Sequence, residues 1–159
     1  MSRSRRIGRR EFGLTLVELI VAFTIMMFLT ALALPLARYK VRREKERELR
    51  YALREIRSAI DRYKDTCEKG GIEKKLGAEC YPESLEQLVE GVKLANDPTG
   101  KKIRFLRRVP RDPFTNSTDW GLRSTQDDPR STSWGGQNVF DVYTKSMERA
   151  PDGTSYSEW

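Results

Sequence analysis

Apolar and polar positions divide the chain into a long apolar run, an amphipathic helix and a polar remainder. Residues 19–37 contain no charged residue. At about 1.5 Å per residue they would span roughly 28 Å as a helix, close to the hydrocarbon thickness of a bilayer. Beyond them, apolar side chains recur at spacings of three and four, the pattern of one buried helix face. This stripe consists of Leu49, Ala52, Leu53, Ile56, Ala59, Ile60 and Tyr63. We therefore predict a transmembrane segment over residues 14–37 and an amphipathic spine helix over 38–66.

The head, residues 67–159, has the pattern of short elements separated by turns. Residues 81–91, YPESLEQLVEG, predict a short helix that ends at a glycine. Residues 96–118 are rich in turn-forming residues. Residues 119–123 and 138–146 alternate apolar and polar side chains, which predicts two antiparallel strands. The expected fold class is α+β, with a long N-terminal helix packed on a small antiparallel sheet.

Positive charge gathers ahead of the apolar run. The net charge is +7, and residues 1–13 hold five arginines and one glutamate. Such a cluster favours a cytoplasmic N-terminus, so we expect the head to lie outside the cytoplasm. The stretch KKIRFLRR, residues 101–108, is the one candidate for a nucleic-acid surface. We interpret it as a solvated basic loop and expect no nucleic-acid partner.

Cys67 and Cys80 are the only cysteines of the chain. A disulfide between them would close a short loop, and a location outside the cytoplasm permits it. The alternative is a pair of unlinked thiols. Because the chain has no histidine and no cysteine pair at zinc spacing, we expect no structural zinc site.

Glu18 directly precedes the apolar run, and a charged side chain at this position needs a physical explanation. A carboxylate near the bilayer core costs about 3 kcal/mol, so we expect it to have a partner. The alternative is a side chain that reaches back to the interface. A secretory signal peptide is cleaved behind its apolar core. Here the apolar run continues into the spine helix without a small-residue cleavage pattern. A glycine, Gly13, lies ahead of the apolar run instead.

The segment GLTLVELIVAFTIMMFLTALALPLA, residues 13–37, resembles the class III signal of type IV pilins and type II secretion pseudopilins. The resemblance implies that a prepilin peptidase removes the leader, residues 1–13, by cutting between Gly13 and Leu14. The same enzyme would then methylate the new amine of Leu14. Glu18 and Pro35 occupy the places where the family carries its glutamate and proline. The family usually has phenylalanine where this chain has Leu14.

The resemblance also implies roles for Glu18 and Pro35 in assembly. In a filament, the Leu14 amine of one subunit would meet Glu18 of its neighbour and set the axial register. Pro35 removes the main-chain hydrogen bond to Ala31 and so allows the helix to stretch there. The family implies a melted helical segment at this proline, and the alternative is a tolerated kink.

The head resembles the major, G-type pseudopilin of type II secretion. The resemblance consists of the YP segment with its helix, Pro110, Asp112, Pro113 and Asn116 of VPRDPFTN, and Asp141, Val142 and Tyr143 of the last strand. That subunit binds calcium in a C-terminal loop, where this chain offers Glu148 and Asp152 as weak candidates. Calcium takes six to eight oxygen ligands. We therefore expect packing of Tyr156 and Trp159 to hold this loop, with calcium as the alternative.

The resemblance implies a structural subunit and not an enzyme. It would polymerise into a periplasmic filament that drives type II protein export. It would be a single-pass protein of the inner membrane, with a cytoplasmic N-terminus and a periplasmic head. The expected partners are further copies of the chain, prepilin peptidase, minor pseudopilins, the inner-membrane assembly platform and membrane lipid. The alternative is a type IV pilin or minor pilin for adhesion, motility or DNA uptake. A membrane-tethered enzyme is disfavoured because no nucleophile–base pair stands out.

Overall fold

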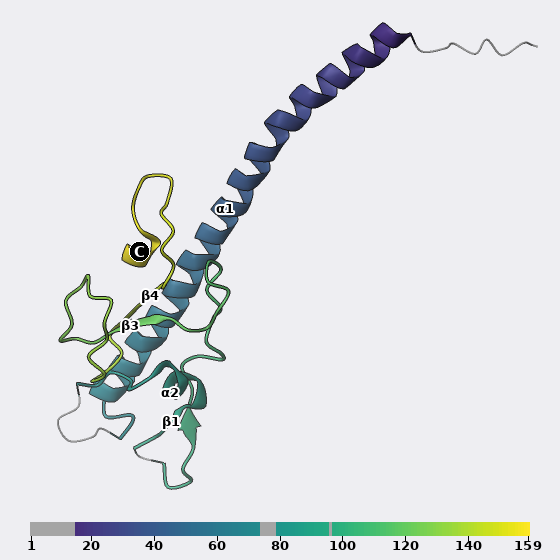
Figure 1. Ribbon diagram of the computed structural model, residues 1–159. Coiled ribbons are helices and arrows are strands. Elements are labelled where there is room, and N and C mark those ends of the chain that lie inside the picture. Colours follow the sequence, from purple (N-terminus) through teal and green to yellow (C-terminus); the bar gives the residue numbers. More distant parts are fainter. Residues whose placement is uncertain (1–14, 74–78, 96) are drawn as a thin grey trace, which may run out of the picture. The chain divides into compact units, whose positions relative to one another are not determined.

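The computed structural model describes residues 15–73, 79–95 and 97–159, and of residues 32–37 it describes the backbone alone. The chain divides into two compact units, Met1–Arg42 and Arg43–Trp159. The elements follow in the order α1 (Leu16–Glu68), α2 (Leu85–Glu90), β1 (Val92–Lys93), β2 (Lys102–Ile103), β3 (Gly121–Arg123), β4 (Asp141–Tyr143) and the 3-10 helix η1 (Tyr156–Glu158) (Figure 1). The predicted α+β class, with a long N-terminal helix packed on small antiparallel structure, is confirmed, although the described residues form two two-stranded sheets where one sheet was expected.

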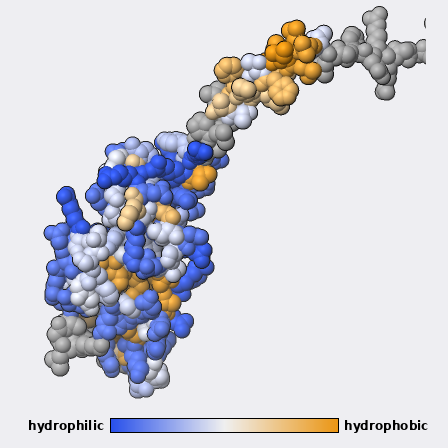
Figure 2. Space-filling model, viewed as in Figure 1, coloured by the Kyte–Doolittle hydropathy of each residue, from blue (hydrophilic) through white to orange (hydrophobic). Residues whose placement is uncertain are grey.

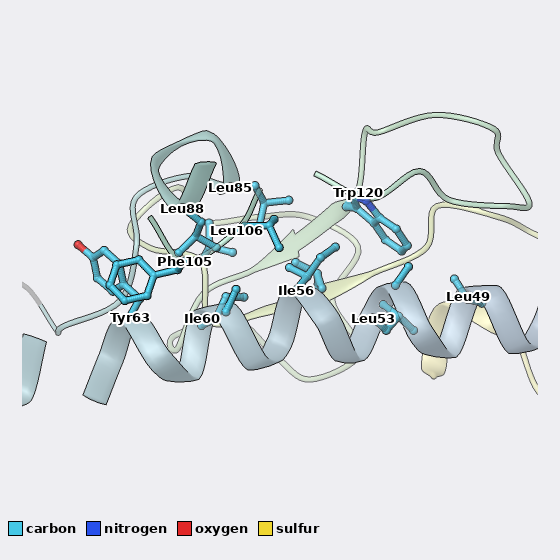
Figure 3. Packing of buried hydrophobic residues seen from close by; sticks show 14 of the residues in the cluster. Leu49, Leu53, Ile56, Ile60, Tyr63, Leu85, Leu88, Phe105, Leu106 and Trp120 are labelled. Atoms are coloured by element: carbon cyan, nitrogen blue, oxygen red, sulfur yellow. The ribbon is translucent and has the colours of Figure 1, made fainter. Parts of the chain in front are cut away.

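The core of the second unit lies between α1 and the head. Every residue of the predicted apolar stripe is buried, from Leu49, which is 0% exposed, to Tyr63, which is 7% exposed. Figure 3 shows these side chains directed toward those of α2, of the segment after β2 and of Trp120. The Tyr63 and Phe105 rings meet edge to face, with centroids 5.4 Å apart. The stripe therefore folds the head onto one face of the helix, as its spacing predicts.

The predicted short helix is α2, and both of its ends have a local cause. The Ser84 hydroxyl accepts a hydrogen bond from the Gln87 N–H and caps the first turn. Gly91 ends the helix at φ +82°, and a Cβ there would lie 2.6 Å from the Ile103 carbonyl oxygen. Glycine is thus required by conformation and by space. The Leu88 carbonyl accepts from the N–H groups of Phe105 and Leu106 at 3.0 Å each, which holds that segment on α2.

Within its described residues, the head contains two antiparallel pairs of strands. The pair β3–β4, in which Leu122 faces Val142, confirms the two predicted strands. A Cβ on Gly121 would lie 2.3 Å from the Tyr143 ring, so only glycine lets that ring cross the strand. The Arg123 guanidinium stacks on the same ring, 4.2 Å from its centroid. Tyr143 is consequently buried although it faces away from Val142 along the strand.

The pair β1–β2, in which Val92 faces Ile103, was not predicted from the pattern. It corrects the interpretation of residues 101–108 as a solvated basic loop, because Phe105 and Leu106 are buried in the core. The apolar residues of this stretch cover the end of the α1 stripe, while its lysines and arginines stay exposed. The segment is therefore a basic surface with an apolar inner side.

A disulfide joins Cys67, in the last turn of α1, to Cys80, ahead of α2. Their Cα atoms are 5.5 Å apart, and both residues are buried. The bond fastens the chain entering α2 to the end of the spine helix.

Loss of this disulfide should destabilise the head. A bond that closes a loop of this length typically contributes about 2–4 kcal/mol by restricting the unfolded chain. We expect Cys67→Ser together with Cys80→Ser to lower the free energy of unfolding in urea by that amount. A reductant should have the same effect on the natural chain and none on the double variant. If the urea midpoint of the natural chain does not change when reductant is added, the Cys67–Cys80 disulfide is contradicted.

Candidate functional site

The start of α1 carries a reciprocal hydrogen-bonded cap formed by Thr15 and Glu18. The Thr15 hydroxyl accepts from the Glu18 N–H at 3.3 Å, and the Glu18 carboxylate accepts from the Thr15 N–H at 3.4 Å. This is a capping box, which satisfies donors that an α-helix leaves open at its first turn. It holds the Glu18 carboxylate at the positive end of the helix dipole. Gly13 and Leu14, the predicted processing residues, lie outside the described residues.

The first unit presents an extensive apolar surface. Eleven large apolar residues between Leu16 and Leu29 have 44–75% of their surface exposed, and Figure 2 shows them gathered over this part of α1. Thr24 and Thr30 donate their hydroxyls to the carbonyls of Ile20 and Met26, at 2.7 Å each. These hydroxyls therefore have partners without water. An exposed apolar surface of this extent indicates a covering of lipid or protein.

Most of the predicted transmembrane segment, and Pro35 with it, belongs to α1. Over the residues that are described, no helix is long and apolar enough to cross a membrane. The backbone of Pro35 lies within α1, and its side chain is not among the described ones.

Asp141 links the sheet to the spine helix. Its carboxylate accepts from Arg57 Nε of α1 at 2.7 Å, and Arg123 Nη1 of β3 lies 3.7 Å away. Arg57 also donates to the carbonyls of Val142 and Trp159, at 3.2 and 2.9 Å. One guanidinium thus fastens β4 and the C-terminal segment to α1. From the sequence, Asp141 is recognisable only as a strand residue, because its partner Arg57 is 84 positions away.

The VPRDPFTN segment is held in place by hydrogen bonds of its buried Asp112 and of its Pro110 carbonyl. Asp112 is fully buried, and its carboxylate accepts from the Phe114 N–H at 2.8 Å and from the Thr144 hydroxyl, just beyond β4. The Trp120 indole donates to the Pro110 carbonyl at 2.9 Å. The segment therefore fixes the chain between β2 and β3 against the end of β4.

The C-terminal loop is held by aromatic packing. Tyr156 is fully buried, with its ring centroid 4.1 Å from that of Phe114 and 4.8 Å from that of Trp159. Its hydroxyl donates to Glu46 of α1 at 2.7 Å. The packing predicted for Tyr156 and Trp159 is present.

Of the calcium candidates in this loop, Asp152 has its carboxylate hydrogen-bonded within the loop, and Glu148 is bonded through its main chain. The Asp152 carboxylate accepts from the hydroxyl and the N–H of Thr154, at 2.7 and 3.0 Å, and these bonds lower its pKa. The Glu148 carbonyl accepts from the Tyr156 N–H at 3.3 Å. Within the described ranges, no three side chains of the metal-binding types form a cluster.

Chelation of calcium is expected to leave the head's melting temperature unchanged. A site saturated a hundredfold above its Kd would add about 2.7 kcal/mol, several degrees for a domain of this size. Thermal scans of the full chain in EDTA and in millimolar calcium should therefore coincide. Tyr156→Ala, which removes a buried ring, should lower the melting temperature in both buffers. A rise of about 4 °C or more with calcium would instead show that the folded chain binds calcium.

Comparison with known proteins identifies the N-terminal segment. The family model of the prokaryotic N-terminal methylation motif matches residues 8–34, which include Gly13, Leu14 and Glu18. No curated protein and no solved structure matches the chain. The motif supports a type IV pilin-like or pseudopilin-like protein, a substrate of the prepilin peptidase. It implies pilus-like assembly and suggests a structural subunit in place of an enzyme.

Proposed function

We propose that the chain is a pseudopilin subunit of type II secretion, which polymerises into a periplasmic filament that drives protein export. The observation that carries the proposal is the methylation motif at residues 8–34, placed at the start of a helix that continues to Glu68 and carries the head. In this proposal residues 1–13 are the cytoplasmic leader and residues 14–37 anchor the chain in the inner membrane. Residues 38–66 form the spine, and residues 67–159 form the periplasmic head.

Glu18 and the Leu14 amine would set the register of the filament. Cleavage after Gly13 creates a positive amine at Leu14, and the capping box keeps the Glu18 carboxylate at the start of α1. At 4 Å, opposite unit charges attract by about 4 kcal/mol at an effective dielectric constant near 20. An amine of one subunit and the carboxylate of the next would therefore favour one axial offset over others. Exposed apolar residues of the same segment would pack against neighbouring copies or lipid.

The disulfide favours a pseudopilin over the alternative, a type IV pilin or minor pilin of an adhesion, motility or DNA-uptake system. Pilins of that kind often close a C-terminal loop with a disulfide. Here the bond lies between α1 and α2, ahead of β3 and β4, and aromatic packing holds the C-terminal loop. In the proposed system, prepilin peptidase, minor pseudopilins and an inner-membrane assembly platform act on this chain.

A deletion strain complemented with variants of the full chain tests the proposal. Deletion should abolish the release of type II substrates into the medium while surface pili and DNA uptake persist. The natural chain should restore release, whereas Glu18→Leu should not, although its leader is still removed. The matched variant Thr15→Ala loses the cap, worth about 1 kcal/mol, but keeps the carboxylate, so it should restore most of the release. Loss of pili with normal protein release would favour the type IV pilin alternative.

A further inference from the structure

The second unit has an arginine-rich groove that none of the features described above uses. It lies between one face of α1 and the segment 107–118, which precedes β3. Figure 1 shows this segment in green beside α1. Six arginines and three glutamates line it, with Tyr51, which is 66% exposed. The arginines are Arg47, Arg50, Arg54, Arg107, Arg108 and Arg111.

Half of the arginines in the groove have no internal partner within the described part of the chain. Among the described residues, the side chains of Arg47, Arg107 and Arg108 make no hydrogen bond or ion pair, and all three are exposed. Their α1 neighbours in the groove, Glu44, Glu48 and Glu55, fall on the face away from the buried stripe. The lining is therefore net positive but mixed in sign. Glutamates interspersed among the arginines would repel a continuous polyanion, whereas a protein surface with a few carboxylates can pair with the arginines.

A complementary surface exists on α2. Glu86 and Glu90 lie one helical turn apart and are exposed, and neither forms an ion pair within the described part of the chain. The opposite face of α2 is fixed, because Leu85 and Leu88 are buried in the core. The two carboxylates therefore point away from their own chain's core and remain available to a second molecule.

We infer that α2 of one copy, through Glu86 and Glu90, docks into the arginine-rich groove of the next copy. The two surfaces differ, so the contact is heterologous, and repetition of a heterologous contact that does not close builds a filament. The inference rests on the proposed filament function and assigns to the heads an ionic contact separate from that of Glu18. Because exposed charges are screened by salt, this contact weakens as ionic strength rises.

Charge reversal in the full chain tests the contact. Filaments are sheared from cells that contain the assembly machinery, and are sedimented and quantified by immunoblot. Arg108→Glu and Glu90→Arg should each lower the yield about tenfold, because each places like charges opposite one another. The double variant restores opposite charges and should return the yield to within about twofold of the natural chain. The matched control is Arg130→Glu, an exposed arginine outside the groove, which should leave the yield unchanged.

The possible outcomes separate the inference from the proposed function. All variants should lose the leader and keep the urea midpoint of the natural chain. Single variants with normal yield, or a double variant without rescue, would overturn the contact. The contact would also be overturned if the natural chain bound a single-stranded oligonucleotide, Arg108→Glu abolished this binding, and Glu90→Arg left it intact. A natural chain that forms no filament overturns the proposed function. The contact is then tested by bismaleimide crosslinking of co-expressed Arg108→Cys and Glu90→Cys chains. A crosslinked dimer of the two variants supports the contact, and the absence of this dimer overturns the contact.

Discussion

Replacing Gly13 by valine is expected to leave the entire population of the chain unprocessed. In the proposed processing the scissile bond lies between Gly13 and Leu14, within the methylation motif, and a β-branched side chain there would crowd the bond that the peptidase must reach. Co-expression with a prepilin peptidase should convert the natural chain to the shorter mature form. Immunoblots of Gly13→Val should show the precursor alone.

Gly8 provides the matched control, because it is a second glycine in the same leader. Gly8→Val should be processed to the same extent as the natural chain. Efficient cleavage of Gly13→Val would place the scissile bond elsewhere and remove the assigned register of Glu18.

Replacing Ile56 by alanine is expected to lower the free energy of unfolding by about 2–5 kcal/mol. Ile56 is fully buried at the centre of the α1 stripe, so the change removes apolar contacts and leaves a cavity. Such a loss is a large share of the stability of a small domain. It can be measured by urea unfolding of the full chain followed through tryptophan fluorescence, since Trp120 is buried in the same core.

Ser58 is the control for this substitution, because it lies two positions along the same helix and is exposed. Ser58→Ala should change the free energy of unfolding by no more than about 0.5 kcal/mol. Equal effects of the two substitutions would contradict the assignment of the buried face.

Periodicity explains which parts of the fold could be predicted. The stripe from Leu49 to Tyr63 repeats over four turns, and its burial follows from spacing alone. Ser84 and Gly91 have side-chain and backbone chemistry that marks the ends of α2 locally. In contrast, β1 and β2 contain two residues each, too few to show an alternation.

The contacts that the sequence could not predict are long-range. Arg57 and Asp141 are 84 positions apart, and many arginines of α1 have the same local pattern. Asp112 was identified only through a resemblance, and its bond to Thr144 depends on how the head folds. The capping box at the start of α1 is different, because Thr15 and Glu18 show the T-x-x-E signature, from which it could have been predicted.

An intact mass of the mature protein from membranes, with and without reduction, decides whether the chain is processed as a prepilin. We expect the loss of residues 1–13 and the addition of one methyl group to the Leu14 amine. Reduction should then add the mass of two hydrogens, because one disulfide joins Cys67 to Cys80. A full-length, unmethylated chain in a host with an active prepilin peptidase would contradict prepilin processing and leave Glu18 without its proposed partner.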